Sequence, residues 1–368
     1  MKKFWTIFLA FLAIVIFASW QYRLLCILLI VIINRRWIKE LAFMQKWKHS
    51  YTCFIITLLV LIYATIPNYW QRGRTQLHYL DANGKHANTP ALVYLANVIF
   101  PEKEVMNLCY KAVAILPIEQ MRLKIAGKSY RIGNKLVSDA HKDFWKGRAV
   151  GFYNAYNHLY LSGSNPGSFV YGQVYNQLFN QSHDAVYITK PKHYDKDKQY
   201  PLVIFCHGYM GSWELYQGLL NGLDDCIVMS IGTKGLDGLS FQIKDCFTKY
   251  IPHLQSLGSN IDMKQLHLMG LSNGGQAANA ALRNYDTKFK TITFISTPCY
   301  VIKKTKSKVL FIGGGKDDSA QGQPSTAKKL KHRGTNVASL FYPNENHYIF
   351  ATQRRDILKF LNEQLHNN

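Results

Sequence analysis

The segment QLHLMGLSNGG, residues 265–275, decides the fold of the C-terminal half of this chain. Residues 265–271 are largely apolar and predict a buried strand, whereas residues 276–282 have the spacing of a helix. Between them, Gly270-Leu271-Ser272-Asn273-Gly274 places a serine on a strand-to-helix turn. A sharp turn there lifts the hydroxyl clear of a sheet, and glycines relieve its crowding. Ser272 is therefore the candidate nucleophile.

Strand-like and helical runs alternate on both sides of this segment, from about residue 183 onward. Strands are expected at 185–189, 201–206, 226–231, 265–271, 291–295, 308–312 and 338–342. Helices are expected at 241–257, 276–282, 325–333 and 354–365. Such alternation predicts an α/β fold with a doubly wound, mostly parallel sheet. Sheets of this kind bind ligands at the carboxyl ends of their strands.

The loop after the strand at 201–206 begins with His-Gly, and it predicts one half of an oxyanion hole. An oxyanion requires two backbone N–H donors about 3 Å from the developing charge. Asn273, directly after the nucleophile, would supply one donor. Tyr209 is favoured over Met210 for the other. We interpret His207 as a residue that organises the loop and not as a catalytic base.

Two carboxylates follow the strand at 308–312. Because of its spacing from the strand, Asp317 is favoured as the acid that orients a catalytic histidine, and Asp318 is the alternative. A solvated turn without catalytic chemistry would also contain Asp and Gly.

The candidate base is His347, in the loop that follows the last expected strand. The other histidines considered lie inside expected elements, His253 in a helix and His267 in a strand, or near a helix end, His332. The nucleophile, acid and base thus follow one another in the chain order Ser, Asp, His, which is the order used by α/β-hydrolases.

Sequence around these motifs resembles a known superfamily. The stretches 187–194 and 198–201, and residues 260–265 leading into the serine motif, are similar to those of α/β-hydrolases of the esterase-D, polyhydroxybutyrate-depolymerase and prolyl-oligopeptidase-like groups. The resemblance covers residues 183–365 and implies serine hydrolysis without indicating a substrate. A third glycine before Lys316 and a short connection from Ile295 to Lys308 depart from the pattern.

Composition narrows the choice of partners. The net charge of +22 is scattered along the chain, so we expect solvated basic faces and no nucleic-acid partner. Seven cysteines, an odd number without Cys-x-x-Cys spacing, do not predict a disulfide framework. We expect neither a metal nor a cofactor.

Three apolar runs before Pro67 predict a transmembrane region, with short spans at about 4–20, 22–34 and 51–67. Absence of a cleavage site argues against a signal peptide. Basic residues between the second and third runs favour a cytoplasmic loop, namely Arg35, Arg36, Lys39, Lys46 and Lys48. This topology requires a turn near 20–23 and places the catalytic domain on the extracytoplasmic side. One tilted helix over 4–33 is the alternative.

The expected organisation is a transmembrane region (1–70), an elaboration of unknown role (71–180) and a catalytic domain (181–368). Within the second part we expect a helix at 101–116, a hairpin at 122–137 and a loop at 163–172. The expected function is a membrane-anchored serine hydrolase acting on an ester. A peptidase, an acyltransferase and a non-catalytic membrane scaffold with the same fold are the alternatives.

Overall fold

A computed structural model of the 368-residue chain describes a defined set of residues. They are residues 7–8, 20–36, 51–60, 75–88, 90–99, 121–125, 128–132, 134–148, 174–176, 178–179, 184–208, 219–223, 225–232 and 243–366. Tyr209, Met210, the expected helix at 101–116 and the expected loop at 163–172 lie outside this set.

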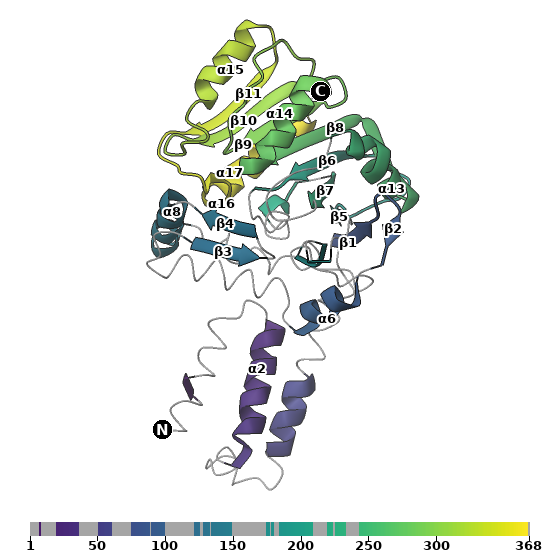
Figure 1. Cartoon of the computed structure of the whole chain (residues 1–368), viewed down its shortest axis with the longest axis vertical. Helices are drawn as coiled ribbons and strands as arrows, with labels where there is room; N and C mark the ends of the chain where they lie inside the picture. Colours follow the sequence, from purple (N-terminus) through teal and green to yellow (C-terminus); the bar gives the residue numbers. More distant parts are fainter. Residues whose placement is uncertain are drawn as a thin grey trace.

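Within the described residues, nine strands form one sheet in the order β11-β10-β9-β8-β6-β7-β5-β1-β2 (Figure 1). The strands are β1 (Thr75–Leu80), β2 (His86–Ala87), β5 (Asp184–Thr189), β6 (Tyr200–Cys206), β7 (Ile227–Gly232), β8 (Ile261–Leu271), β9 (Thr291–Ile295), β10 (Lys308–Gly314) and β11 (Val337–Tyr342). The six strands from β6 to β11 run parallel, whereas β5, β1 and β2 pair antiparallel. The predicted mostly parallel α/β sheet is confirmed.

Helices cover both faces of this sheet (Figure 1). They are α12 (Ile243–Asp245), the π-helix η2 (Cys246–Tyr250), α13 (Ile251–Ser256), α14 (Gly275–Asn284) and α15 (Gln323–His332) on one face, and α16 (Ile349–Thr352) and α17 (Arg354–His366) on the other. Side chains of β6 show the two-residue period that this requires. Leu202 and Ile204 join the first core cluster, and Val203 and Phe205 join the second. Burial of all seven residues of β6 explains its continuous apolar sequence.

The sheet extends further back in the chain than the expected domain boundary at 181. Strand β1 pairs with β5 over six residues, from Thr75 opposite Thr189 to Leu80 opposite Asp184. Strands β1 and β2, from the region expected to be an elaboration, therefore belong to the same sheet as the strands of the expected catalytic domain. Local periodicity could not reveal this, because the partner of β1 lies more than a hundred positions later.

Four further elements come from the same region. The expected hairpin is present as β3 (Met121–Ile125) and β4 (Lys128–Ile132), which pair antiparallel. Its predicted second arm is too long, since residues from Asn134 form helix α8 (Asn134–Trp145). Helix α6 (Ala91–Ile99) follows the β1–β2 pair.

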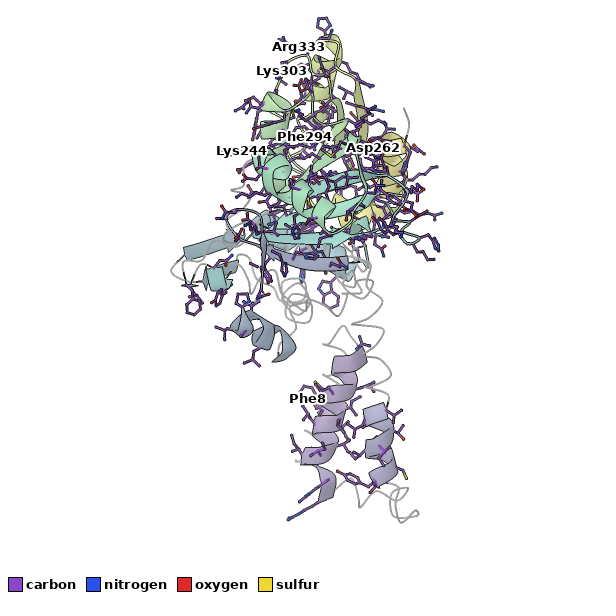
Figure 2. The ribbon with its side chains drawn as sticks, turned by 90° about the vertical axis from the view of Figure 1, so that its right-hand side faces the viewer. Phe8, Lys244, Asp262, Phe294, Lys303 and Arg333 are labelled. Carbon is purple, nitrogen blue, oxygen red and sulfur yellow. The ribbon has the colours of Figure 1, made fainter. Side chains whose placement is uncertain are left out.

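The N-terminal part contains α2 (Trp20–Ile33) and a helix over residues 51–60, which project away from the sheet (Figure 1). Buried Val31 of α2 packs against Tyr51 and Phe54 of the second helix. The chain reversal expected near residues 20–23 is wrong in part, because these residues are helical and form the first turn of α2. Figure 2 shows Phe8 beside these helices, apart from the sheet region that holds Phe294. Among the described residues, no helix is both long and apolar enough to cross a membrane.

Candidate active site

Ser272 lies at the sharp turn that ends β8. Its φ angle of 52° is in the left-handed region, which a non-glycine residue occupies only when the surroundings impose it. The 3-10 turn η3 (Ser272–Gly274) and α14 follow immediately. A Cβ on Gly274 would lie 2.1 Å from the carbonyl oxygen of Cys206, so the turn is pressed against the end of β6. Glycine is required there because backbone, and not a flexible side chain, occupies the space.

His347 lies between Ser272 and Asp317. Its Nε2 is 2.9 Å from Oγ of Ser272, and its Nδ1 is 3.0 Å from Oδ2 of Asp317. A carboxylate can only accept, so Nδ1 carries the proton and Nε2 is left to accept from the serine hydroxyl. The sequence-predicted nucleophile, base and acid are therefore brought into one hydrogen-bonded chain, although they come from three separate loops.

The structure distinguishes the two candidate acids. The Asp317 side chain is 3% exposed, and its Oδ1 accepts from the backbone N–H of Ser319 at 2.9 Å. The Asp318 side chain is 72% exposed and lies 2.6 Å from Nζ of Lys135. Only Asp317 contacts His347, as the spacing argument favoured.

The turn at Ser272, here called the elbow, and the start of the His-Gly loop lie side by side at the carboxyl ends of two neighbouring strands. Strands β6 and β8 are parallel neighbours, with Cys206 opposite Gly270, so both chains leave the sheet side by side. This is the point where strand order reverses, at which such sheets bind ligands. Asn273 lies in η3 beside the serine, and its side-chain oxygen accepts from Gln276 at 2.7 Å.

His207 is buried, and its Nδ1 donates to the carbonyl oxygen of Gly208 at 2.7 Å. Burial lowers the pKa of His207 to about 4, so the ring is neutral at pH 7. The expectation of a loop-organising histidine agrees with this local bond. His267 also lies away from the serine, within 2.9 Å of Oγ1 of Thr291 inside the sheet.

The sequence did not reveal which residues hold the loop that carries His347. Oγ of Ser296, at the end of β9, donates to the carbonyl oxygen of His347 at 3.2 Å. On the other side, residues of α8 bond to neighbours of His347, such as Asp143 to Asn346. A contact between positions 203 apart leaves no periodic signal in the chain. In the part of the chain that the structure describes, no group of three His, Cys, Asp or Glu could hold a metal ion.

No protein-family model matches the chain, and no curated protein matches its sequence. Solved structures with a similar arrangement include a candidate dipeptidyl aminopeptidase IV from Bacteroides ovatus, with 18% identity, a TM-score of 0.40, and coverage of 51% of this chain and 34% of that one. A thermostable esterase shows 19% identity and a TM-score of 0.40, and the match covers 50% of this chain and 60% of the esterase chain. The feruloyl esterase module of Clostridium thermocellum shows 14% identity and a TM-score of 0.41, and the match covers 50% of this chain and 84% of the module.

The chain thus spans about a third to four fifths of these proteins and matches them over half its own length. Independently of them, the sheet order, the parallel β6–β8 pair and the turn at Ser272 give this chain an α/β-hydrolase-like fold.

Proposed function

We propose that this protein is a serine hydrolase that cleaves carboxylic esters through an acyl-enzyme intermediate. The observation that carries the proposal is the hydrogen-bonded chain from Oγ of Ser272 through His347 to the buried carboxylate of Asp317. A serine hydroxyl is a weak nucleophile until an adjacent base accepts its proton. An imidazole whose Nδ1–H donates to Asp317 presents its Nε2 lone pair to the serine hydroxyl, which meets that requirement.

In the proposed mechanism Ser272 attacks the ester carbonyl carbon while Nε2 of His347 accepts the hydroxyl proton. The carbonyl π electrons move onto oxygen, and the backbone N–H groups of Asn273 and Tyr209 would stabilise the oxyanion. When the carbon–oxygen bond to the alcohol breaks, His347 returns the proton to the leaving oxygen. Water then repeats the sequence on the acyl-enzyme. Asp317 orients the imidazole and stabilises its protonated form.

The same residues could serve a peptidase, or an acyltransferase in which another alcohol replaces water. An ester is favoured because an alkoxide oxygen is expelled more readily than an amine nitrogen, so less assistance is required. A panel of short-chain p-nitrophenyl esters compared with aminoacyl-naphthylamides separates these reactions. Preference for the amides would overturn the ester assignment.

A fluorophosphonate probe tests the nucleophile directly. Wild type should be labelled, Ser272→Ala should not, and Ser325→Ala, which alters an exposed serine of α15, should be labelled like wild type. Circular dichroism establishes that each protein is folded. Folded wild type that stays unlabelled would contradict the proposal and favour a non-catalytic scaffold.

We further infer that the N-terminal region anchors the enzyme in a membrane with the catalytic domain on the extracytoplasmic side. Support comes from the three apolar runs, from the basic segment between residues 33 and 51, and from large apolar side chains exposed on both N-terminal helices. The exposed side chains are Leu25, Leu29, Ile32, Ile33, Ile56, Leu59 and Val60.

Cysteine-accessibility tagging tests this topology. Single cysteines are introduced near Arg35 and near Asn368, in a background in which the exposed Cys53 is replaced by serine. A membrane-impermeant thiol reagent added to intact cells should label the C-terminal position and leave the position near Arg35 unlabelled. The proposed topology is wrong if both positions report the same side.

A further inference from the structure

Helix α8, from the region whose role the sequence leaves open, bonds directly to the loop that carries His347. Nδ2 of Asn346 donates to Oδ2 of Asp143 at 2.8 Å, and the hydroxyl of Tyr348 donates to the carbonyl oxygen of Leu136 at 3.1 Å. The residues before and after His347 are therefore both held by one helix. Figure 1 shows α8 lying next to α16, which begins two residues after His347.

Arg148, just after α8, completes this contact. Its guanidinium bonds to the carboxylate of Glu345 and lies 3.4 Å from Oδ1 of Asp143. Glu345 also accepts from Oγ1 of Thr352 and from Nε2 of Gln353, each at 2.9 Å. Arg148 thereby ties α8 to the loop and, through Glu345, to the chain around α16. We call Leu136, Asp143 and Arg148 the α8 clamp.

Burial indicates which of these contacts matter. Asp143 is 2% exposed, Glu345 7% and Asn346 9%, so their polar groups have little access to water and depend on one another. The Arg148 side chain is 34% exposed, but removing it would leave the buried carboxylates of Asp143 and Glu345 without their cationic partner. The nearby pair Lys135–Asp318 has both side chains at least half exposed and lines a cavity of about 390 Å³ between α8 and the loops, so solvent and salt screen it.

The loop is held on its inner side as well. Oγ of Ser296 donates to the carbonyl oxygen of His347, and a Cβ on Gly314 would lie 2.2 Å from the carbonyl oxygen of Glu345. Residues at the ends of the strands contact the backbone of the loop, and the α8 clamp contacts the side chains of Glu345, Asn346 and Tyr348. With the loop held on both sides, the His347 imidazole lies within 3.0 Å of both Asp317 and Ser272.

We propose that the α8 clamp positions His347, so that Asp143 and Arg148 act as positioning residues for the catalytic base and residues 136–148 complete the active site. This inference rests on the proposed hydrolase function. An error of about 1 Å in the position of a catalytic group can lower a rate about a hundredfold. Loss of the clamp should therefore lower kcat and leave KM nearly unchanged, because the clamp does not contact the serine.

The test uses the full chain with p-nitrophenyl acetate and a fluorophosphonate probe. Arg148→Ala and Asn346→Ala should each lower kcat and the labelling rate about 10- to 100-fold. The double variant Asp143→Ala/Asn346→Ala should lose less activity than the product of its two single losses, because both substitutions break the Asn346–Asp143 hydrogen bond, while Asp143 also pairs with Arg148 and Oδ1 of Asn346 also accepts from the backbone N–H of Tyr348. Arg148→Lys should restore part of the rate. Lys135→Ala, the matched control on the same helix, should stay within about twofold of wild type.

Tyr348→Phe provides a second route if a clamp variant does not fold, because it removes one hydroxyl and keeps the ring. It should lower kcat several-fold. Hydrogen exchange at the backbone amides of residues 345–348 gives a readout that does not depend on activity, and exchange should accelerate in Arg148→Ala and Tyr348→Phe.

The outcomes separate the two proposals. Folded clamp variants with wild-type kcat, or with wild-type exchange at residues 345–348, overturn the positioning role and leave the hydrolase intact. Lower kcat together with a matching rise in KM would indicate a role in substrate binding and also overturns it. Failure of wild type to react with the probe overturns the hydrolase itself, while accelerated exchange would still show that the clamp holds the loop.

Discussion

Oδ2 of Asp317 lies 3.0 Å from Nδ1 of His347, whereas the carboxylate one position later points away to Lys135. We predict that Asp317→Asn lowers kcat about ten-thousandfold, because an amide can stabilise the wrong tautomer of the imidazole. Asp318→Asn should remain within about twofold, since it alters an exposed ion pair. Measuring kcat for ester hydrolysis by the two variants shows which aspartate is the catalytic acid. Equal losses would contradict the assignment of the acid.

The tight packing of the turn after Ser272 predicts that the stability of the fold depends on glycine at position 274. Gly274→Ala should lower the free energy of unfolding by at least about 1–3 kcal/mol, because its Cβ would overlap the carbonyl oxygen of Cys206. Gly322→Ala is the matched control. That position has nothing within 4 Å and a φ of −80°, so its effect should be within about 0.5 kcal/mol. Urea unfolding compares the variants, and similar midpoints would refute the packing argument.

The centre of the sheet should be sensitive to loss of volume. Phe294 lies within the sheet region (Figure 2) and is fully buried. Its ring centroid lies 5.5 Å from that of Phe311. Phe294→Ala should lower the free energy of unfolding by about 3–5 kcal/mol, through lost burial and the cavity left behind. Leu257→Ala, at a position 38% exposed, should cost much less. A smaller change at Phe294 than at Leu257 would show that the core is not where the sheet places it.

Acid should destabilise the fold through two buried histidines. Burial lowers the pKa of His207 to about 4 and that of His267 to about 3, compared with 6.5 when unfolded. Above pH 6.5 neither state binds these protons, so they add no pH dependence. Below pH 6.5 the unfolded chain takes them up and the folded chain does not, which favours unfolding. Each histidine then lowers the free energy of unfolding by about 1.4 kcal/mol per pH unit, down to about pH 4 for His207 and about pH 3 for His267.

Replacing one of these histidines isolates its contribution. His267→Gln should reduce the pH slope of stability between pH 6.5 and 4.5 by about one proton, as measured by urea unfolding. The exposed His332→Gln, in α15, is the control. An unchanged slope in His267→Gln would mean that acid unfolding has another origin.

Most strands of the C-terminal half are predictable because each buried strand carries its own apolar run. Strand β9 forms at the expected residues 291–295, and β6 and β10 differ from expectation only at their ends. The errors fall where local pattern is weak. β8 begins at Ile261, four residues early, in a stretch where Met263 and Lys264 are exposed. Strand β1 is a short strand that pairs with a distant segment, so its sequence alone does not show its partner.

The sequence by itself determined the alternation of elements, the turn at Ser272 and the order of serine, aspartate and histidine, because these depend on periodicity and on glycine at a few positions. The tertiary structure decided between Asp317 and Asp318 and showed how α8 holds the loop of His347. The physical reason is distance along the chain. Side-chain direction at a strand end and contacts between positions 203 apart arise only when the sheet has brought the loops together.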